Sequence, residues 1–162
     1  MRFVGLQPLQ GVVDPVAVND AATKQYVDTQ VAAGGGGAAG LTRKTVTVTA
    51  TAAAAGANRT LTAALGASYV LLSVRTTAPA RVRLYPTAAA AAADASRAVT
   101  ADPAATVPLI LEYVTGDTTA VPVTPGVFGA PFGQAGTTVI VTNNSASTTD
   151  LSVELTYLAM EV

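Results

Sequence analysis

The feature that most constrains the fold of this chain is a change in the spacing of its apolar residues near residue 40, from a helical period to a period of two. Beyond that point, apolar and polar residues alternate strictly in residues 44–49, 69–76 and 80–85, and further strand candidates lie at residues 109–115, 137–142 and 151–160. A period of two places alternate side chains on opposite faces of a strand. Turn-forming residues separate the candidates, and the abundant Thr favours a pleated surface. The sequence therefore predicts an all-β domain, a jelly-roll-like β-sandwich over residues 41–162.

One stretch inside this domain favours a helix instead. Residues 88–98 contain a run of six Ala followed by Asp94 and Arg97, which stand one helical turn apart. We expect a short helix here that closes one end of the sandwich. The alternative is a disordered, low-complexity Ala linker.

The segment before residue 40 has a different organisation. Residues 34–40 are rich in Gly and predict a flexible linker. Residues 19–31 predict a helix of about three turns, which is marginal in water when it is alone. Its apolar face, with Thr23, Val27 and Val31, is narrow and needs partners. We therefore interpret residues 1–33 as an attachment and trimerisation segment.

Composition excludes several classes of chemistry. The 162 residues include no Cys, His or Trp, so imidazole acid–base chemistry, a thiolate nucleophile, a Cys/His zinc site and a disulfide framework are all excluded. Nine Lys and Arg against ten Asp and Glu give no basic excess for binding nucleic acid. The 34 Ala inflate the hydrophobic fraction, and the longest apolar run is far shorter than the roughly 20 residues that span a membrane. We expect no nucleic-acid partner, no membrane insertion and no secretion signal.

The carboxylates do not form a recognisable catalytic pattern. A glycosidase needs two of them at one cleft, one with a raised pKa, and the sequence spacing brings no two together. Their positions favour strand or turn roles, and they lack the spacing of a calcium-binding loop. We expect no catalytic residue, no metal site, no cofactor and no enzyme activity. The candidates considered are Asp94, Asp102, Glu112, Asp117, Asp150 and Glu154.

Arginine is concentrated in the middle of the β domain. Alternation places Arg81 and Arg83 on one face of their strand together with Tyr85. One interpretation is a solvated sheet face. The other is a subunit interface, because the guanidinium group binds carboxylates such as Asp94 or Glu112 in a bidentate manner and tolerates partial burial.

Two of the three Phe residues lie in residues 124–136, among Gly and Pro. The pattern predicts an irregular loop of more than a dozen residues, and such loops are uncommon unless they are functional or disordered. Phe128 and Phe132 either fold back onto the sandwich or contact a receptor as apolar or sugar-stacking groups.

Residues 20–28 read D-A-A-T-K-Q-Y-V-D and follow the stretch L-Q-G-V-V at residues 9–13. This element resembles one that recurs in tail fibres and related appendage proteins of tailed bacteriophages. Residues 68–72, 79–85 and 155–158 resemble, more loosely, small C-terminal domains of phage fibres. The resemblance implies a virion protein, usually a homotrimer, that is assembled in the host cytoplasm, and it supplies no catalytic residue.

Three functional hypotheses follow from these observations. The first is a phage tail fibre or fibre tip that attaches to a host glycan or protein and binds other phage proteins through its N-terminal segment. The second is a capsid decoration or head-fibre protein without a receptor role. The third is a polysaccharide depolymerase, which the lack of paired carboxylates disfavours.

Overall fold

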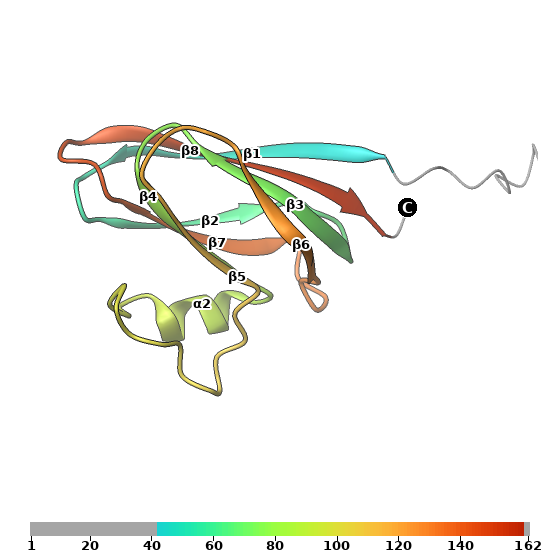
Figure 1. Ribbon diagram of the computed structural model, residues 1–162. Helices are drawn as coiled ribbons and strands as arrows, with labels where there is room; N and C mark the ends of the chain where they lie inside the picture. Colours follow the sequence, from blue (N-terminus) through green and yellow to red (C-terminus); the bar gives the residue numbers. More distant parts are fainter. Residues whose placement is uncertain (1–41, 161–162) are drawn as a thin grey trace, which may run out of the picture. The chain divides into compact units, whose positions relative to one another are not determined.

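The computed structural model describes residues 42–160, and these form a sandwich of two β-sheets (Figure 1). The predicted helix over residues 19–31, the linker over residues 34–40 and the candidate interface residues Thr23, Val27 and Val31 lie outside the described residues. The elements are β1 (Arg43–Ala53), β2 (Asn58–Ala63), β3 (Tyr69–Thr76), β4 (Ala80–Tyr85), α2 (Ala88–Asp94), β5 (Leu111–Thr115), β6 (Val121–Gly129), β7 (Thr137–Asn143) and β8 (Thr149–Ala159).

The strand order is that of an eight-stranded jelly roll. One sheet has the order β1-β8-β3-β6 and the other β2-β7-β4-β5, and every pair is antiparallel. The first four strands therefore pair with the last four in reverse order, β1 with β8 through to β4 with β5. This long ribbon then rolls up, so that β3 also pairs with β8 and β4 with β7. The predicted all-β sandwich is confirmed.

The core lies between the inner faces of the two sheets, where alternation places the apolar residues. Leu155 of β8, for example, stands in register with Val46 of β1 on one side and Val74 of β3 on the other. Val82 of β4 stands opposite Val141 of β7 in the second sheet. Most of these side chains are buried, and each large one contributes about 1.5–3 kcal/mol through removal of its surface from water.

Six predicted strands are present, and two strands were not predicted. β2 has only one large apolar side chain, Leu61, and most of its residues are exposed. β6 contains Pro122 and Pro125, and the second of these lies in the predicted loop. It pairs only with β3, and such an edge strand tolerates Pro because one side of its backbone needs no ladder partner. The predicted loop over residues 124–136 is therefore wrong up to Gly129, and the irregular part follows that residue.

The segment between β4 and β5, residues 86–110, contains the predicted helix. α2 begins after Thr87, whose side-chain oxygen accepts a hydrogen bond from the N–H of Ala90. The helix packs against Tyr85 and Ile140, which point outward from β4 and β7. It thus covers the outer face of the sheet β2-β7-β4-β5 and does not close an end of the sandwich as predicted (Figure 1). The alternative of a disordered Ala linker is wrong for the same reason.

Candidate functional site

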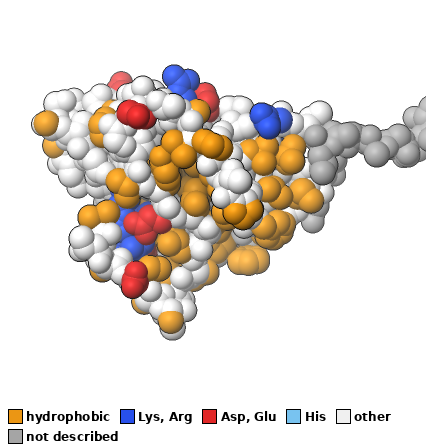
Figure 2. All heavy atoms as spheres, viewed as in Figure 1, with side chains coloured by type: hydrophobic (Ala, Val, Ile, Leu, Met, Phe, Trp, Pro, Cys, Tyr) orange, Lys and Arg blue, Asp and Glu red, His pale blue; other side chains and the backbone are white. Residues whose placement is uncertain are grey.

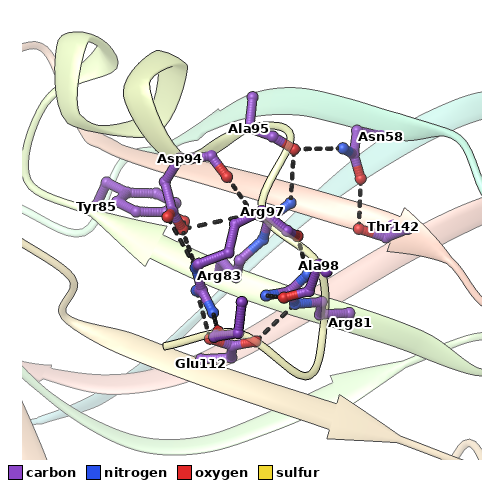
Figure 3. Close-up of polar contacts among 11 residues, drawn as sticks. Asn58, Arg81, Arg83, Tyr85, Asp94, Ala95, Arg97, Ala98, Glu112 and Thr142 are labelled. Atoms are coloured by element: carbon purple, nitrogen blue, oxygen red, sulfur yellow. Dashed lines mark hydrogen bonds and ion pairs between the residues drawn. The ribbon is translucent and has the colours of Figure 1, made fainter. Parts of the chain in front are cut away.

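The four ion pairs found among residues 42–160 all lie in one cluster beside α2 (Figure 3). Alternation along β4 directs three polar side chains to the outer face of their sheet, where the segment of residues 86–110 covers them. α2 and the turn that follows it contribute one carboxylate and one guanidinium group, and β5 contributes a second carboxylate. The arginine cluster, as we call it, consists of Arg81, Arg83, Tyr85, Asp94, Arg97 and Glu112.

The two carboxylates each bind two guanidinium groups. Glu112 accepts from Nε of Arg81 at 2.6 Å and from Nη2 of Arg97 at 2.5 Å. Asp94 accepts from Nε of Arg97 at 2.8 Å and lies 3.5 Å from Nη1 of Arg83. Because these contacts join β4, β5 and the end of α2, they hold the covering segment against the sheet.

Backbone carbonyl groups complete the coordination of the arginines. Nη1 of Arg83 donates to the carbonyl oxygen of Asp94 at 2.6 Å, and Nη1 of Arg81 donates to that of Arg97 at 2.6 Å. Positive groups at a helix C-terminus also interact favourably with its dipole. Nε of Arg83 has no hydrogen-bond partner among residues 42–160, although the side chain is fully buried. Among residues 42–160, Asp94 supplies the carboxylate that compensates this buried charge.

Burial and hydrogen bonding set the protonation states of the cluster. Burial acts to raise the pKa of Asp94, but hydrogen bonds from Arg97 and Tyr85 and the nearby positive charges outweigh it, so the pKa lies below the ordinary value of 3.8. The same balance, with hydrogen bonds from Arg97 and Arg81, lowers the pKa of Glu112. Burial and its hydrogen bond to Asp94 raise the pKa of Tyr85 to about 12. Both carboxyl groups are therefore ionised, and neither is suited to the proton donation that a glycosidase requires.

The arrangement corrects the prediction for Arg81 and Arg83. Their side chains are 5% and 0% exposed, so this is not a solvated sheet face. Asp94 and Glu112, which were expected as partners across a subunit interface, bind the two arginines within a single chain. The structure thus places Arg81 and Arg83 inside the subunit and gives the cluster a structural role.

The second candidate site is an apolar hollow of about 230 Å³ beside the end of β6. Phe128 and Phe132 are 63% and 72% exposed, so the prediction that both rings fold back onto the sandwich is wrong. Figure 2 shows apolar side chains gathered on the surface over β3 and β6. Both rings line the hollow together with Pro86, Pro108, Leu109, Ile110, Gly129 and Ala130.

The register of β6 explains why Phe128 points outward. Its neighbours Val127 and Gly129 stand opposite Leu71 and Tyr69, which face the core, so Phe128 lies on the other face. Phe132 lies in the turn after β6 with φ of 44°, a left-handed conformation that costs a residue with a Cβ atom about 1–2 kcal/mol. An exposed ring on a strained backbone is a feature that core packing does not require.

The side chains that line this hollow can make apolar contacts with a partner, and none of them carries an acid, a base or a nucleophile. All the residues that line it are apolar, so it offers ring faces and aliphatic surface to a partner. An apolar side chain or the flat face of a ring-shaped ligand would fit this surface.

The remaining carboxylates are dispersed over the domain. Asp117 accepts a hydrogen bond from the N–H of Thr119 at 2.8 Å, which confirms its predicted turn role. Asp150 lies in β8 and accepts from the N–H of Ala52 at 2.8 Å, beside an irregularity in β1. Within residues 42–160, no three acidic residues gather to hold a metal ion, and none of the helices is long and apolar enough to cross a membrane.

The described domain is therefore an eight-stranded jelly roll that carries a buried ionic cluster and an exposed apolar hollow. The chain matches no model of a known protein family, and searches of curated proteins and of solved structures gave no match either.

Proposed function

We propose that this chain is a structural protein of a tailed-bacteriophage particle, a short trimeric tail fibre or fibre tip that attaches the particle to its host. The element at residues 20–28, with its resemblance to phage appendage proteins, carries the assignment to a phage particle. The jelly-roll order supports it by analogy, because this architecture recurs in viral capsid and lectin domains.

The exposed rings of Phe128 and Phe132 support the attachment role. Two large apolar groups that face solvent beside a hollow have an unfavourable hydration free energy unless a partner covers them. Three copies on one axis would raise the avidity of a weak contact by orders of magnitude through effective concentration. The protein in this proposal has no catalytic role and needs no cofactor.

The proposed homotrimer forms through residues 1–33, with Thr23, Val27 and Val31 at the subunit contact. A helix of about three turns gains stability when its apolar face packs against copies of itself. Arg81 and Arg83 have no part in this contact, because their partners lie within the same chain. Other phage structural proteins bind the same N-terminal segment, and the assembly takes place in the host cytoplasm.

Adsorption of particles to host cells tests the attachment role. The variant Phe128→Ala/Phe132→Ala should keep its free energy of unfolding within about 1 kcal/mol, because truncating exposed rings costs little, whereas a buried Phe costs about 3–5 kcal/mol. Its adsorption should fall strongly.

The matched control is Val99→Ala/Val114→Ala, which truncates two exposed apolar residues that do not line the hollow. The control should adsorb as the unmodified protein does. Undiminished adsorption of the Phe variant with an intact fold would replace the attachment role with that of a capsid decoration or head fibre.

A further inference from the structure

The outer face of the sheet β1-β8-β3-β6 changes character along its strands. Near one end, Leu158, Val70 and Phe128 stand in register across β8, β3 and β6 and make an apolar row. Further along β8 the matching row is polar, with Thr47, Glu154 and Arg75 in register across β1, β8 and β3. Because both rows lie on paired strands, the geometry of each is fixed by the backbone ladder.

The polar row borders a second surface hollow of about 110 Å³. This volume exceeds the roughly 10–15 Å³ that a cavity needs to hold one water molecule, so the hollow has room for ordered water. We name it the polar hollow, and its lining residues are Thr47, Arg75, Thr76, Thr77, Ser152 and Glu154.

Arg75 and Glu154 stand opposite each other but do not form an ion pair. Nε of Arg75 donates to the carbonyl oxygen of Thr118 at 3.0 Å, which ties the guanidinium group to the turn between β5 and β6. Within residues 42–160, the Glu154 carboxylate has no hydrogen bond and no ion pair. A carboxylate has about four acceptor positions, so Glu154 presents unused acceptor capacity at the hollow.

Donor capacity lies beside it. The terminal nitrogens of Arg75 make no other hydrogen bond among the described residues, and the hydroxyl of Thr47 makes none there either. Ser152 adds a hydroxyl that already shares a 2.8 Å hydrogen bond with Thr49. The polar hollow thus combines an acceptor-only group, a donor-only group and hydroxyls that do both.

These groups select for a neutral ligand with closely spaced hydroxyls. One guanidinium and one carboxylate give the hollow no net formal charge, so it offers no advantage to an anion or a cation. Adjacent hydroxyls of a sugar ring can donate to the carboxylate and accept from the guanidinium group, and they replace the waters that the hollow would otherwise hold. We propose that the polar hollow is a carbohydrate-binding site, with Glu154 and Arg75 as its central contacts.

This inference does not depend on the assignment to a phage particle or on the role of the Phe rings, because it concerns sugar binding by the protein itself. The test is a titration of the full chain by ¹H–¹⁵N NMR with four separate sugars: glucose, galactose, N-acetylglucosamine and rhamnose. We expect saturable shifts of the amide signals of Thr47, Arg75, Ser152 and Glu154 with at least one of them. The site is small and open, so the dissociation constant should be on the order of 1 mM.

Two pairs of variants separate the hollow from the general surface. Glu154→Gln should weaken binding about tenfold or more, since hydrogen bonds to charged groups are the strong ones, while Asp102→Asn removes an exposed carboxylate outside the hollow and should change nothing. Thr47→Val should weaken binding, while Thr45→Val, one row along the same face, should not.

Three results would overturn the proposal. They are an absence of saturable shifts with all four sugars, shifts confined to the surroundings of Phe128 and Phe132, and unchanged binding by a folded Glu154→Gln variant. Melting curves of each variant establish that it is folded before it is titrated.

Discussion

Replacing Asp94 with Asn should lower the free energy of unfolding by about 3 kcal/mol. The side chain is 4% exposed, and its oxygens lie 2.8 and 2.9 Å from Nε of Arg97 and 3.5 Å from Nη1 of Arg83. Asn keeps the shape but removes the charge, which leaves the fully buried Arg83 without a carboxylate. Removing one partner of a buried ion pair costs about 3–5 kcal/mol. Arg97 keeps Glu112, and Arg83 keeps two carbonyl oxygens, so we expect the lower end of this range.

Urea unfolding of the full chain, followed by circular dichroism, measures this difference as a lower midpoint with an unchanged slope. The control is Asp102→Asn, an exposed position in the same covering segment, which should change stability by less than about 0.5 kcal/mol. A loss below about 1 kcal/mol for Asp94→Asn would refute the argument that the cluster holds the segment of residues 86–110 in place.

Four further predictions concern the arginine cluster, the packing of β6, the domain boundary and the assembly. The pKa values of both cluster carboxyl groups are lowered in the folded protein, so their contribution to stability is present above about pH 4.5, the ordinary pKa of Glu. This contribution is lost as the pH falls through the lower folded-state pKa values. The urea midpoint should therefore drop in acid, and it should drop less in the Asp94→Asn variant. Gly129→Ala should destabilise by about 1–3 kcal/mol, because its Cβ would lie 2.3 Å from the buried ring of Tyr69, whereas Gly116→Ala meets open space and should change the midpoint little. A fragment of residues 41–162 should melt cooperatively, and a broad, non-cooperative melt would move the domain boundary. Light scattering of the full chain at micromolar concentration should give the mass of a trimer, and a monomer mass would refute the assembly.

Local alternation was sufficient to predict some strands and not others. Residues 69–76 and 80–85 form β3 and β4 with the predicted limits. In β4 the apolar residues face the core at every second position, whereas in β3 an irregularity between Leu71 and Ser73 interrupts the alternation, so that Leu71 and Val74 both face the core. β2 and β6 are edge strands of their sheets, with few buried side chains. Their strand conformation depends on pairing with β7 and β3, which are distant in the sequence, so no local pattern reports it.

The candidate sites show the same limit. Alternation correctly grouped Arg81, Arg83 and Tyr85 on one face. The chemistry of the guanidinium group pointed to Asp94 or Glu112 as partners, but across a subunit interface rather than within one chain. A period shows which residues share a face, but it does not show what covers that face. The cover comes from α2 and the segment around it, whose path depends on packing against Ile140 and Tyr85.

The polar hollow was not anticipated for a related reason. Thr47, Arg75 and Glu154 lie in three separate predicted strands. Each occupies a polar position of its alternating pattern, which predicts only that its side chain faces outward. Only the register of β1, β8 and β3 brings them into one row. The alternating polar positions of these strands were a signal, but their pairing order was not available from the sequence.

The central claim is that this protein is a component of a tailed-phage particle and acts where the particle meets its host. Immunogold electron microscopy of purified particles, with an antibody against the β domain, tests it most directly. Label at the tail tip or on the tail fibres is the predicted result. Particles that carry no label, although the antibody binds the purified protein, would contradict the claim, and label confined to the head would contradict the attachment role.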